Sequence, residues 1–286
     1  MIHHIKESTG HSVRLICQAL RVPRSSYYHA AQATRSEVSD AKLSDSIKAI
    51  FWRHKRRYGY RRICKDLEED GHACSPKRVR RLMKENGLVA LQPKSYKPQT
   101  SDGRADAPSP NRLKDELPPE KIRKTNQAWV GDITYIACGD QWLYLAVVMD
   151  LCSRRIVGWS LADHLRSSLV EEAMEKALKS RQCPTGIIFH SDRGSQYGSK
   201  TFRALIKKAQ IQQSMSGRAN PYDNATMESF MGTFKGELMQ DGSFMNQEDA
   251  ELEIAEFVNY YNTQRRHSSL AYLTPFQFEE NLTKAA

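Results

Sequence analysis

Residues 186–197 form an apolar run that ends in an acid and a turn, Gly186-Ile187-Ile188-Phe189-His190-Ser191-Asp192-Arg193-Gly194-Ser195-Gln196-Tyr197. The apolar part predicts a β-strand, and Arg193-Gly194-Ser195 predicts the turn that follows it. Asp192 would then lie at the carboxyl end of a strand, which is where open α/β sheets place their functional sites. We therefore take this strand as the element around which the rest of the chain is arranged.

Two further acids stand in separate predicted elements. Asp132 lies in the apolar, β-branched run 129–136, which is typical of a strand. A carboxylate in such a run is costly to bury unless it is paired or bound to a metal. Glu228 lies near the start of a predicted helix, 225–239. Three carboxylates from three elements are what a two-metal site for phosphoryl transfer requires, because hard divalent cations such as Mg²⁺ take oxygen ligands.

The spacing of these acids gives little support by itself. Between Asp132 and Asp192 lie 59 residues, and between Asp192 and Glu228 lie 35. The chain holds 33 Asp and Glu, so a pair with the second spacing is expected by chance. Most acids in such a chain are solvated surface groups. The sequences around the three acids are more specific than their spacing.

Three motifs resemble those of bacterial insertion-sequence transposases, more narrowly the second-frame (OrfB) product of two-frame elements. They are His190 to Tyr197, Tyr222 to Phe230 with Lys235, and Tyr260-Tyr261-Asn262-Thr263-Gln264-Arg265-Arg266-His267-Ser268-Ser269-Leu270 through Thr274-Pro275. The resemblance covers nearly the whole chain and implies an RNase H-like core related to retroviral integrases. It places a D,D(35)E triad on Asp132, Asp192 and Glu228 without a departure at these positions. Such a triad implies Mg²⁺ or Mn²⁺, as two ions.

Two residues near Glu228 are candidates for DNA contact. Lys235 lies seven residues after Glu228, two helical turns along on the same face. A lysine there could hold a DNA phosphate beside the metals. Asn224 resembles a DNA-contacting position of the family, and a helix N-cap is an equally good interpretation.

Two other groups of side chains near the triad also have more than one interpretation. His190 could orient Asp192 or touch substrate, although a buried histidine satisfied by hydrogen bonds is the alternative. Arg265, Arg266 and His267 predict a basic edge near the site, and the family motif assigns them no firm role.

Positive charge is concentrated in the N-terminal third of the chain. The 286 residues carry a net charge of +10, which indicates an acidic polymer as partner. Residues 1–95 hold 20 Lys and Arg against 9 Asp and Glu, whereas the remainder has a net charge of −1. We therefore expect double-stranded DNA to be bound there.

The cysteines and the hydropathy exclude several classes of protein. Six scattered cysteines without a C-x-x-C pair argue against a disulfide framework or a zinc finger, unlike the zinc module of retroviral integrases. There is no signal peptide and no apolar run long enough to span a membrane. We expect a cytoplasmic bacterial protein that is associated with the nucleoid when it binds DNA.

Four segments can be delimited along the chain. Residues 1–38 predict a helix-turn-helix-like segment, with a small packing hairpin as the alternative. Residues 39–91 predict a helix-turn-helix DNA-binding domain. Residues 92–124 hold six of the eleven prolines and predict an extended or disordered linker. Residues 125–286 predict the catalytic core with C-terminal helices, so the fold class is an α/β RNase H-like core, a mixed sheet flanked by helices, with an N-terminal all-α helix-turn-helix region.

The predicted DNA-binding domain carries most of the candidate DNA contacts. Its basic residues flank the aromatic Tyr58 and Tyr60 or lie in a last helix that Ser75-Pro76 would begin. The candidates are Arg56, Arg57, Arg61, Arg62, Lys77, Arg78, Arg80, Arg81 and Lys84. A basic helix can also be merely a solvated face. Most of these residues would contact phosphates rather than bases.

The predicted core alternates strands and helices around one sheet. Strands are expected at 129–136, 141–150, 154–161, 186–191 and 211–215. Helices are expected at 167–180, 199–209, 225–239 and 248–261. The polar loop 216–220 could be a mobile flap near the site or an inert connection.

The resulting functional hypothesis is a DNA transposase that binds element ends and carries out metal-dependent strand cleavage and strand transfer. The resemblance suggests a circular intermediate and implies a first-frame (OrfA-type) product as partner or fusion. Two ends must meet, so we expect a homodimer or a larger homo-oligomer. An RNase H-like nuclease without strand transfer and a DNA-binding regulator with a relic core are the alternatives. The intact triad argues against the relic, and the basic N-terminal region argues for end binding.

Overall fold

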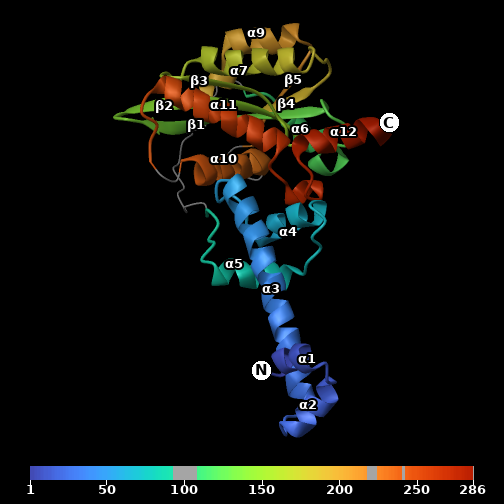
Figure 1. The fold of residues 1–286 in the computed structure, drawn as a ribbon. Helices are drawn as coiled ribbons and strands as arrows, with labels where there is room; N and C mark the ends of the chain where they lie inside the picture. The colour runs from blue at the N-terminus through green and yellow to red at the C-terminus, as the bar shows by residue number, and fades with distance from the viewer. Residues whose placement is uncertain (93–107, 218–223, 240–241, 286) are drawn as a thin grey trace. The chain divides into compact units, whose positions relative to one another are not determined.

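The computed structural model describes residues 1–92, 108–217, 224–239 and 242–285, without the side chains of residues 29–38 and 285 (Figure 1). The chain divides into two compact units, Met1–Ala90 and Leu91–Ala286. In the described parts of the chain, no helix is both long enough and apolar enough to cross a membrane.

The first unit is all-α among its described residues. Its helices are α1 (Ile2–Thr9), α2 (Val13–Ala19), α3 (Arg24–Arg53), α4 (Tyr60–Glu69) and α5 (Pro76–Glu85). Ser12 begins α2 and Ser75 begins α5, because each hydroxyl accepts a hydrogen bond from a backbone N–H of the first turn. Gly10 ends α1 in the left-handed conformation, which glycine adopts without strain.

The core of this unit lies where α3, α4 and α5 meet. Apolar side chains at helical spacing turn inward, and the buried ones include Leu43, Ile47, Ile50, Phe51, Ile63, Leu67, Val79, Leu82 and Met83. A buried His54 packs its ring on Tyr58 at 3.7 Å and bonds Asp66 through Nε2 at 2.8 Å. Helix α3 is continuous across residues 38 and 39, so the two N-terminal segments expected from sequence share one helix.

The second unit is built on a five-stranded mixed sheet. Its strands are β1 (Ala128–Cys138), β2 (Gln141–Asp150), β3 (Ile156–Ala162), β4 (Ile188–Ser191) and β5 (Gln212–Met215), in the order β3-β2-β1-β4-β5. The first three strands are antiparallel, and β4 and β5 run parallel to β1. The expected fold class, an RNase H-like α/β core with an N-terminal all-α region, is confirmed.

Helices cover both faces of this sheet (Figure 1). On one face lie α7 (Ser167–Ser180), α8 (Ser195–Gly198) and α9 (Lys200–Lys208), which share a core with Trp129 of β1. On the other lie α10 (Ala225–Leu238) and α11 (Gln247–Thr263), which share a core with Val130. Trp129 and Val130 are adjacent, so their opposite directions follow from the alternation of side chains along a strand.

The short elements of the second unit are α6 (Arg112–Asp115), η1 (Pro119–Lys121), η3 (Ser268–Leu270) and α12 (Pro275–Ala285). Two of them lie in the segment expected to be a linker, and this expectation is wrong for residues 108–124. Leu113 and Ile122 are buried in the core beside α10 and α11. The Leu113 N–H also donates to Ser214 Oγ of β5 at 3.1 Å. Residues 93–107 lie outside the described residues.

Candidate active site and DNA-contacting residues

The register of the two central strands brings Asp132 and Asp192 to the same level of the sheet. Val130 of β1 pairs with His190 of the parallel strand β4. Two residues later come Asp132, which is still within β1, and Asp192, which directly follows β4, so this register places the two acids beside each other. Asp192 comes directly after the last residue of β4, at the carboxyl end, as its sequence context predicts.

The carboxyl group of Asp132 lies in an environment that disfavours its negative charge. One of its oxygens accepts a hydrogen bond from the Ile133 N–H at 2.8 Å. Burial, followed by the negative charge of Asp192 and a smaller contribution from Glu228, raises the pKa of Asp132 to about 7. Lys235 acts in the opposite direction. The titration of Asp132 therefore responds to the three other candidate site residues.

Asp192 is held by the turn that follows it. Its Oδ1 accepts the Gly194 N–H at 2.9 Å, and burial raises its pKa against that hydrogen bond. A Cβ on Gly194 would lie 3.0 Å from the same oxygen and 3.0 Å from Oε1 of Gln196. The turn therefore favours glycine at this position.

Helix α10 presents Glu228 in its first turn and Lys235 two turns later. Glu228 is exposed, whereas Lys235 is partly buried. Burial lowers the pKa of Lys235, and the charge of Asp132 opposes that shift. The opposite side of the helix packs on the core through Met227, Phe230 and Phe234.

His190 is fully buried between β4 and β5. Its Nδ1 bonds the hydroxyl of Ser214 at 2.8 Å and its Nε2 bonds that of Ser216 at 3.1 Å. This geometry favours the interpretation as a buried histidine satisfied by hydrogen bonds. Its two serine partners were not recognised from sequence, since nothing in a local pattern pairs residues 24 and 26 positions apart.

Asn224 stands at the N-cap position of α10 but does not cap it. Its side chain makes no hydrogen bond to the first turn. The side chain is buried, and its Oδ1 has no hydrogen-bond partner among the described residues. Tyr222 and Asp223 of the same motif lie outside the described residues, as does most of the expected flap, 218–220.

The expectation of a basic edge at Arg265, Arg266 and His267 is wrong, because all three side chains are buried. Arg265 forms an ion pair with Glu237 of α10, and Arg266 donates to the Tyr272 carbonyl at 3.1 Å. A buried arginine needs such partners, and sequence alone does not reveal them.

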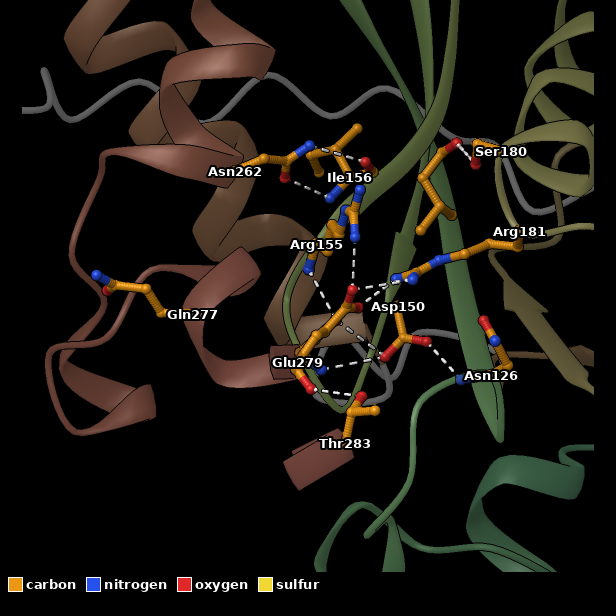
Figure 2. Close-up of polar contacts among 12 residues, drawn as sticks. Asn126, Asp150, Arg155, Ile156, Ser180, Arg181, Asn262, Gln277, Glu279 and Thr283 are labelled. Atoms are coloured by element: carbon orange, nitrogen blue, oxygen red, sulfur yellow. Dashed lines mark hydrogen bonds and ion pairs between the residues drawn. The ribbon is translucent and has the colours of Figure 1, made fainter. Parts of the chain in front are cut away.

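A second polar cluster, which includes no residue of the triad, was not foreseen (Figure 2). Glu279 of α12 binds both Arg155 and Arg181, while Asp150 accepts the Asn126 N–H at 2.6 Å. The Asn262 amide bonds the backbone N–H and carbonyl of Ile156, at 2.9 and 3.0 Å. These contacts attach the C-terminal helices to β3 and α7.

The candidate DNA contacts of α5 divide into two sets. Arg78 and Arg81 both bind Asp40 of α3, and hydrogen bonds from Arg81 and Arg78 hold the pKa of Asp40 below its ordinary value. The second set is Lys77, Arg80 and Lys84, which are exposed, as Arg81 also is, and which share one face of the helix.

The remaining candidates cluster around the turn between α3 and α4. Arg56 is exposed, Arg61 lies over the Tyr60 ring at 5.0 Å, and Arg62 lies over the Tyr58 ring at 5.6 Å. Arg57 is buried, so in this structure its side chain lies inside the first unit and not on a surface that DNA could contact.

Comparison with known proteins agrees with this arrangement. Residues 123–221 and 209–275 each match an integrase core domain, and residues 37–96 match an HTH-like domain. The chain is 40% identical over 249 residues to the transposase of insertion sequence element IS904 from Lactococcus lactis, covering 86% of this chain and 97% of that protein. It is 34% identical over 280 residues to the transposase InsF of insertion sequence IS3A from Escherichia coli K12, covering 96% of both chains.

Two solved integrase cores were found in the comparison of structures. The HTLV-2 integrase catalytic core in complex with magnesium is 16% identical, with a TM-score of 0.39 over 55% of this chain and 96% of that one. The core domain of BIV integrase is 19% identical, with a TM-score of 0.42 over 56% and 99%. On its identity to the two transposases and its matches to the integrase core family models, the chain belongs to the insertion-sequence transposases, the DNA strand-transferring enzymes of the DDE type.

Proposed function

We propose that this transposase binds the ends of its element through the first unit and cleaves and joins DNA strands with Asp132, Asp192 and Glu228. The observation that carries the proposal is the meeting of Asp132 and Asp192 at one level of the sheet, where burial and mutual repulsion raise the pKa of Asp132. A carboxyl group whose pKa is raised by burial and a neighbouring charge is typical of functional sites.

The donor set fits a hard divalent cation. Carboxylate oxygens are the preferred ligands of Mg²⁺ and Mn²⁺, and a cation would remove the repulsion that Asp132 experiences. In the described parts of the chain, no three His, Cys, Asp or Glu side chains are grouped closely enough to hold a metal ion. We infer that Glu228 completes the site from α10. When bound, two such ions supply the positive charge that activates the attacking oxygen and stabilises the leaving one.

The reaction would consist of two successive displacements at phosphorus, which the side chains of the site support. In the first, a water oxygen forms a bond to phosphorus at an element end, and the broken P–O bond leaves a 3′-OH. In the second, this 3′-OH attacks another phosphodiester, and one P–O bond again replaces another. Asp132 and Asp192 are held for this purpose by the Ile133 and Gly194 N–H groups. Lys235 would neutralise a phosphate beside them.

The assembly follows from the need to bring two ends together. We propose a homodimer or larger oligomer that acts on DNA in the bacterial cytoplasm, with a first-frame product as partner or fusion. The first target would be the opposite end of the same element, which gives a circular intermediate.

Strand joining on labelled DNA that bears the element's own ends tests the proposal. Wild type, Asp192→Asn and Glu228→Gln are compared with Mg²⁺ or Mn²⁺, with and without the first-frame product. We expect wild type to join ends and both variants to bind DNA without joining it. Nicking without regard to end sequence would instead show a nuclease, and active variants would show that the site is elsewhere.

The binding of element ends can be tested separately by substitutions on the exposed face of α5. Replacing Lys77, Arg80 and Lys84 with alanine should weaken DNA binding and reduce the slope of log affinity against log salt by roughly one unit per lost phosphate contact. Fluorescence anisotropy over a salt series measures both. Asp40→Asn is the matched control, because it removes the partner of Arg78 and Arg81 and should lower stability while the slope stays as in wild type. Equal slopes in all three proteins would contradict the assignment.

A further inference from the structure

Helix α10 is attached at its C-terminal end by a buried ion pair. The Arg265 guanidinium donates from Nε to both oxygens of Glu237, at 3.1 and 2.9 Å, and from a terminal nitrogen to Oε1 at 2.6 Å. The two side chains are only 6% and 10% exposed. The guanidinium also lies 5.6 Å from the centroid of the Tyr261 ring. Such a bidentate ion pair fixes the relative orientation of the two side chains as well as the distance between them.

The other end of α10 is attached by a different arginine. Arg154, in the turn between β2 and β3, donates to the hydroxyl of Thr226 in the first turn of the helix. Both arginines thus come from outside α10, and Glu228 and Lys235 lie between the two attachments.

The direction of these attachments matters because apolar packing leaves a helix some freedom to slide and turn. Glu237 follows Glu228 by nine residues, or about two and a half turns, so the two side chains point to opposite sides of the helix. The apolar contacts of Phe230 and Phe234 bury one side of α10 in the core. Such contacts are not directional, so they do not by themselves fix the rotation of the helix. A hydrogen-bonded pair on the side away from Glu228 therefore sets the rotation that aims Glu228.

We propose that Arg265 is a positioning residue of the transposase, which acts through Glu237 to fix the rotation and axial placement of α10, with Arg154 as the second attachment. The motif from Tyr260 to Pro275, which contains Arg265, thereby gains a role that is separate from the triad. The proposal rests on the proposed role of Glu228. Its local part, the attachment of α10, can be tested independently of catalysis.

The chain offers a matched control in another arginine–glutamate pair. Arg181 of the α7 end binds Glu279 of α12, and both side chains are 12% exposed (Figure 2). That pair is similarly enclosed, but it attaches α12 rather than α10. Arg181→Ala should therefore loosen the protein by a comparable mechanism without redirecting Glu228.

The experiment compares wild type with Arg265→Ala, Arg265→Lys, Glu237→Gln, Arg181→Ala and Glu228→Gln. Hydrogen exchange of peptides covering α10 and α12, thermal unfolding, end-DNA affinity and the cleavage rate at saturating DNA are measured over a Mg²⁺ series. Arg265→Ala should speed exchange in α10 and slow cleavage by about 100-fold, as a misplacement of about 1 Å does, with unchanged DNA affinity. Arg265→Lys should recover part of the rate, and the Mg²⁺ midpoint should rise in both variants.

Arg181→Ala should lower the unfolding temperature, speed exchange only in α12 and keep a cleavage rate near that of wild type. The proposal is overturned if α10 exchanges as in wild type in Arg265→Ala, or if the two arginine variants slow cleavage equally. Should Arg265→Ala fail to fold, Glu237→Gln and Arg265→Lys decide by the same readouts. An active Glu228→Gln would overturn the proposed role of Glu228, whereas an inactive Glu228→Gln beside a fully active Arg265→Ala would overturn only the positioning role.

Discussion

Asp132→Asn is expected to slow strand cleavage by about a thousandfold or more and, above neutral pH, to make the metal-free protein more stable than wild type. The rate falls because an amide cannot supply the negative oxygen ligand, and a loss of several kcal/mol of transition-state stabilisation corresponds to this factor. The stability rises because the carboxylate of Asp132 is repelled by Asp192 and Glu228 and partly buried. A substitution that abolishes activity while adding stability is a mark of a functional site rather than of a structural acid.

The sign of the pH dependence follows from the direction of the pKa shift. The pKa of Asp132 is raised from 3.8 to about 7 in the folded protein, so between these values the native state binds a proton that the unfolded state has lost. The free energy of unfolding therefore falls as pH rises through this window and is lowest, on account of this group, above about pH 7. Partial exposure of Asp132 reduces the effect to about 1–3 kcal/mol.

Thermal unfolding in chelator at about pH 5 and about pH 8 measures this effect. Asp132→Asn should unfold several degrees above wild type at the higher pH and close to it at the lower pH. Mg²⁺ should then stabilise wild type by mass action and leave Asp132→Asn nearly unchanged. Glu175→Gln, at an exposed position of α7, is the control for the loss of one negative charge. A difference between wild type and Asp132→Asn that is the same at both pH values would contradict the environment assigned to Asp132.

The strands and helices of the core could be predicted from the sequence because the apolar residues in each one recur with the period of that secondary structure. The run around Asp132 became β1, and the run before Asp192 became β4, whose carboxyl end holds the acid. Alternating burial on β1 then explains why its neighbouring residues serve two different cores.

What the sequence could not provide are the partners of polar side chains. Arg265 was expected at a basic edge, yet it lies inside the protein against Glu237, 28 positions earlier in the chain. The pairing of Arg78 and Arg81 with Asp40 could likewise not be read from the sequence. A local pattern records whether a side chain is charged, whereas its burial depends on a partner that only the folded chain brings near. The same limit applies to the apolar residues Leu113 and Ile122. They lie in a proline-rich segment that predicted a linker, and only the folded chain shows that they are buried in the core.

Gly158→Ala is expected to have the largest effect on the stability of the catalytic unit. Gly158 lies in β3, where the strand packs against α7. A Cβ at this position would lie 2.2 Å from the Ala173 carbonyl oxygen, 2.6 Å from the Ala177 nitrogen and 2.8 Å from the Ala177 Cβ. Two of these three are backbone atoms of a helix, so no side-chain rotation can relieve the contact, and α7 has to move away from the sheet.

Such overpacking should cost about 3 kcal/mol or more, which is a large part of the usual 5–15 kcal/mol stability of a domain. Thermal unfolding should show a midpoint roughly 6–12 °C lower than in wild type. Gly232→Ala is the matched control, because nothing lies within 4 Å of a Cβ there and the residue stands inside α10. It should raise stability by about 0.5–1 kcal/mol, since alanine favours a helix and restricts the unfolded chain. If the two variants changed the midpoint alike, the close contact between β3 and α7 would be refuted.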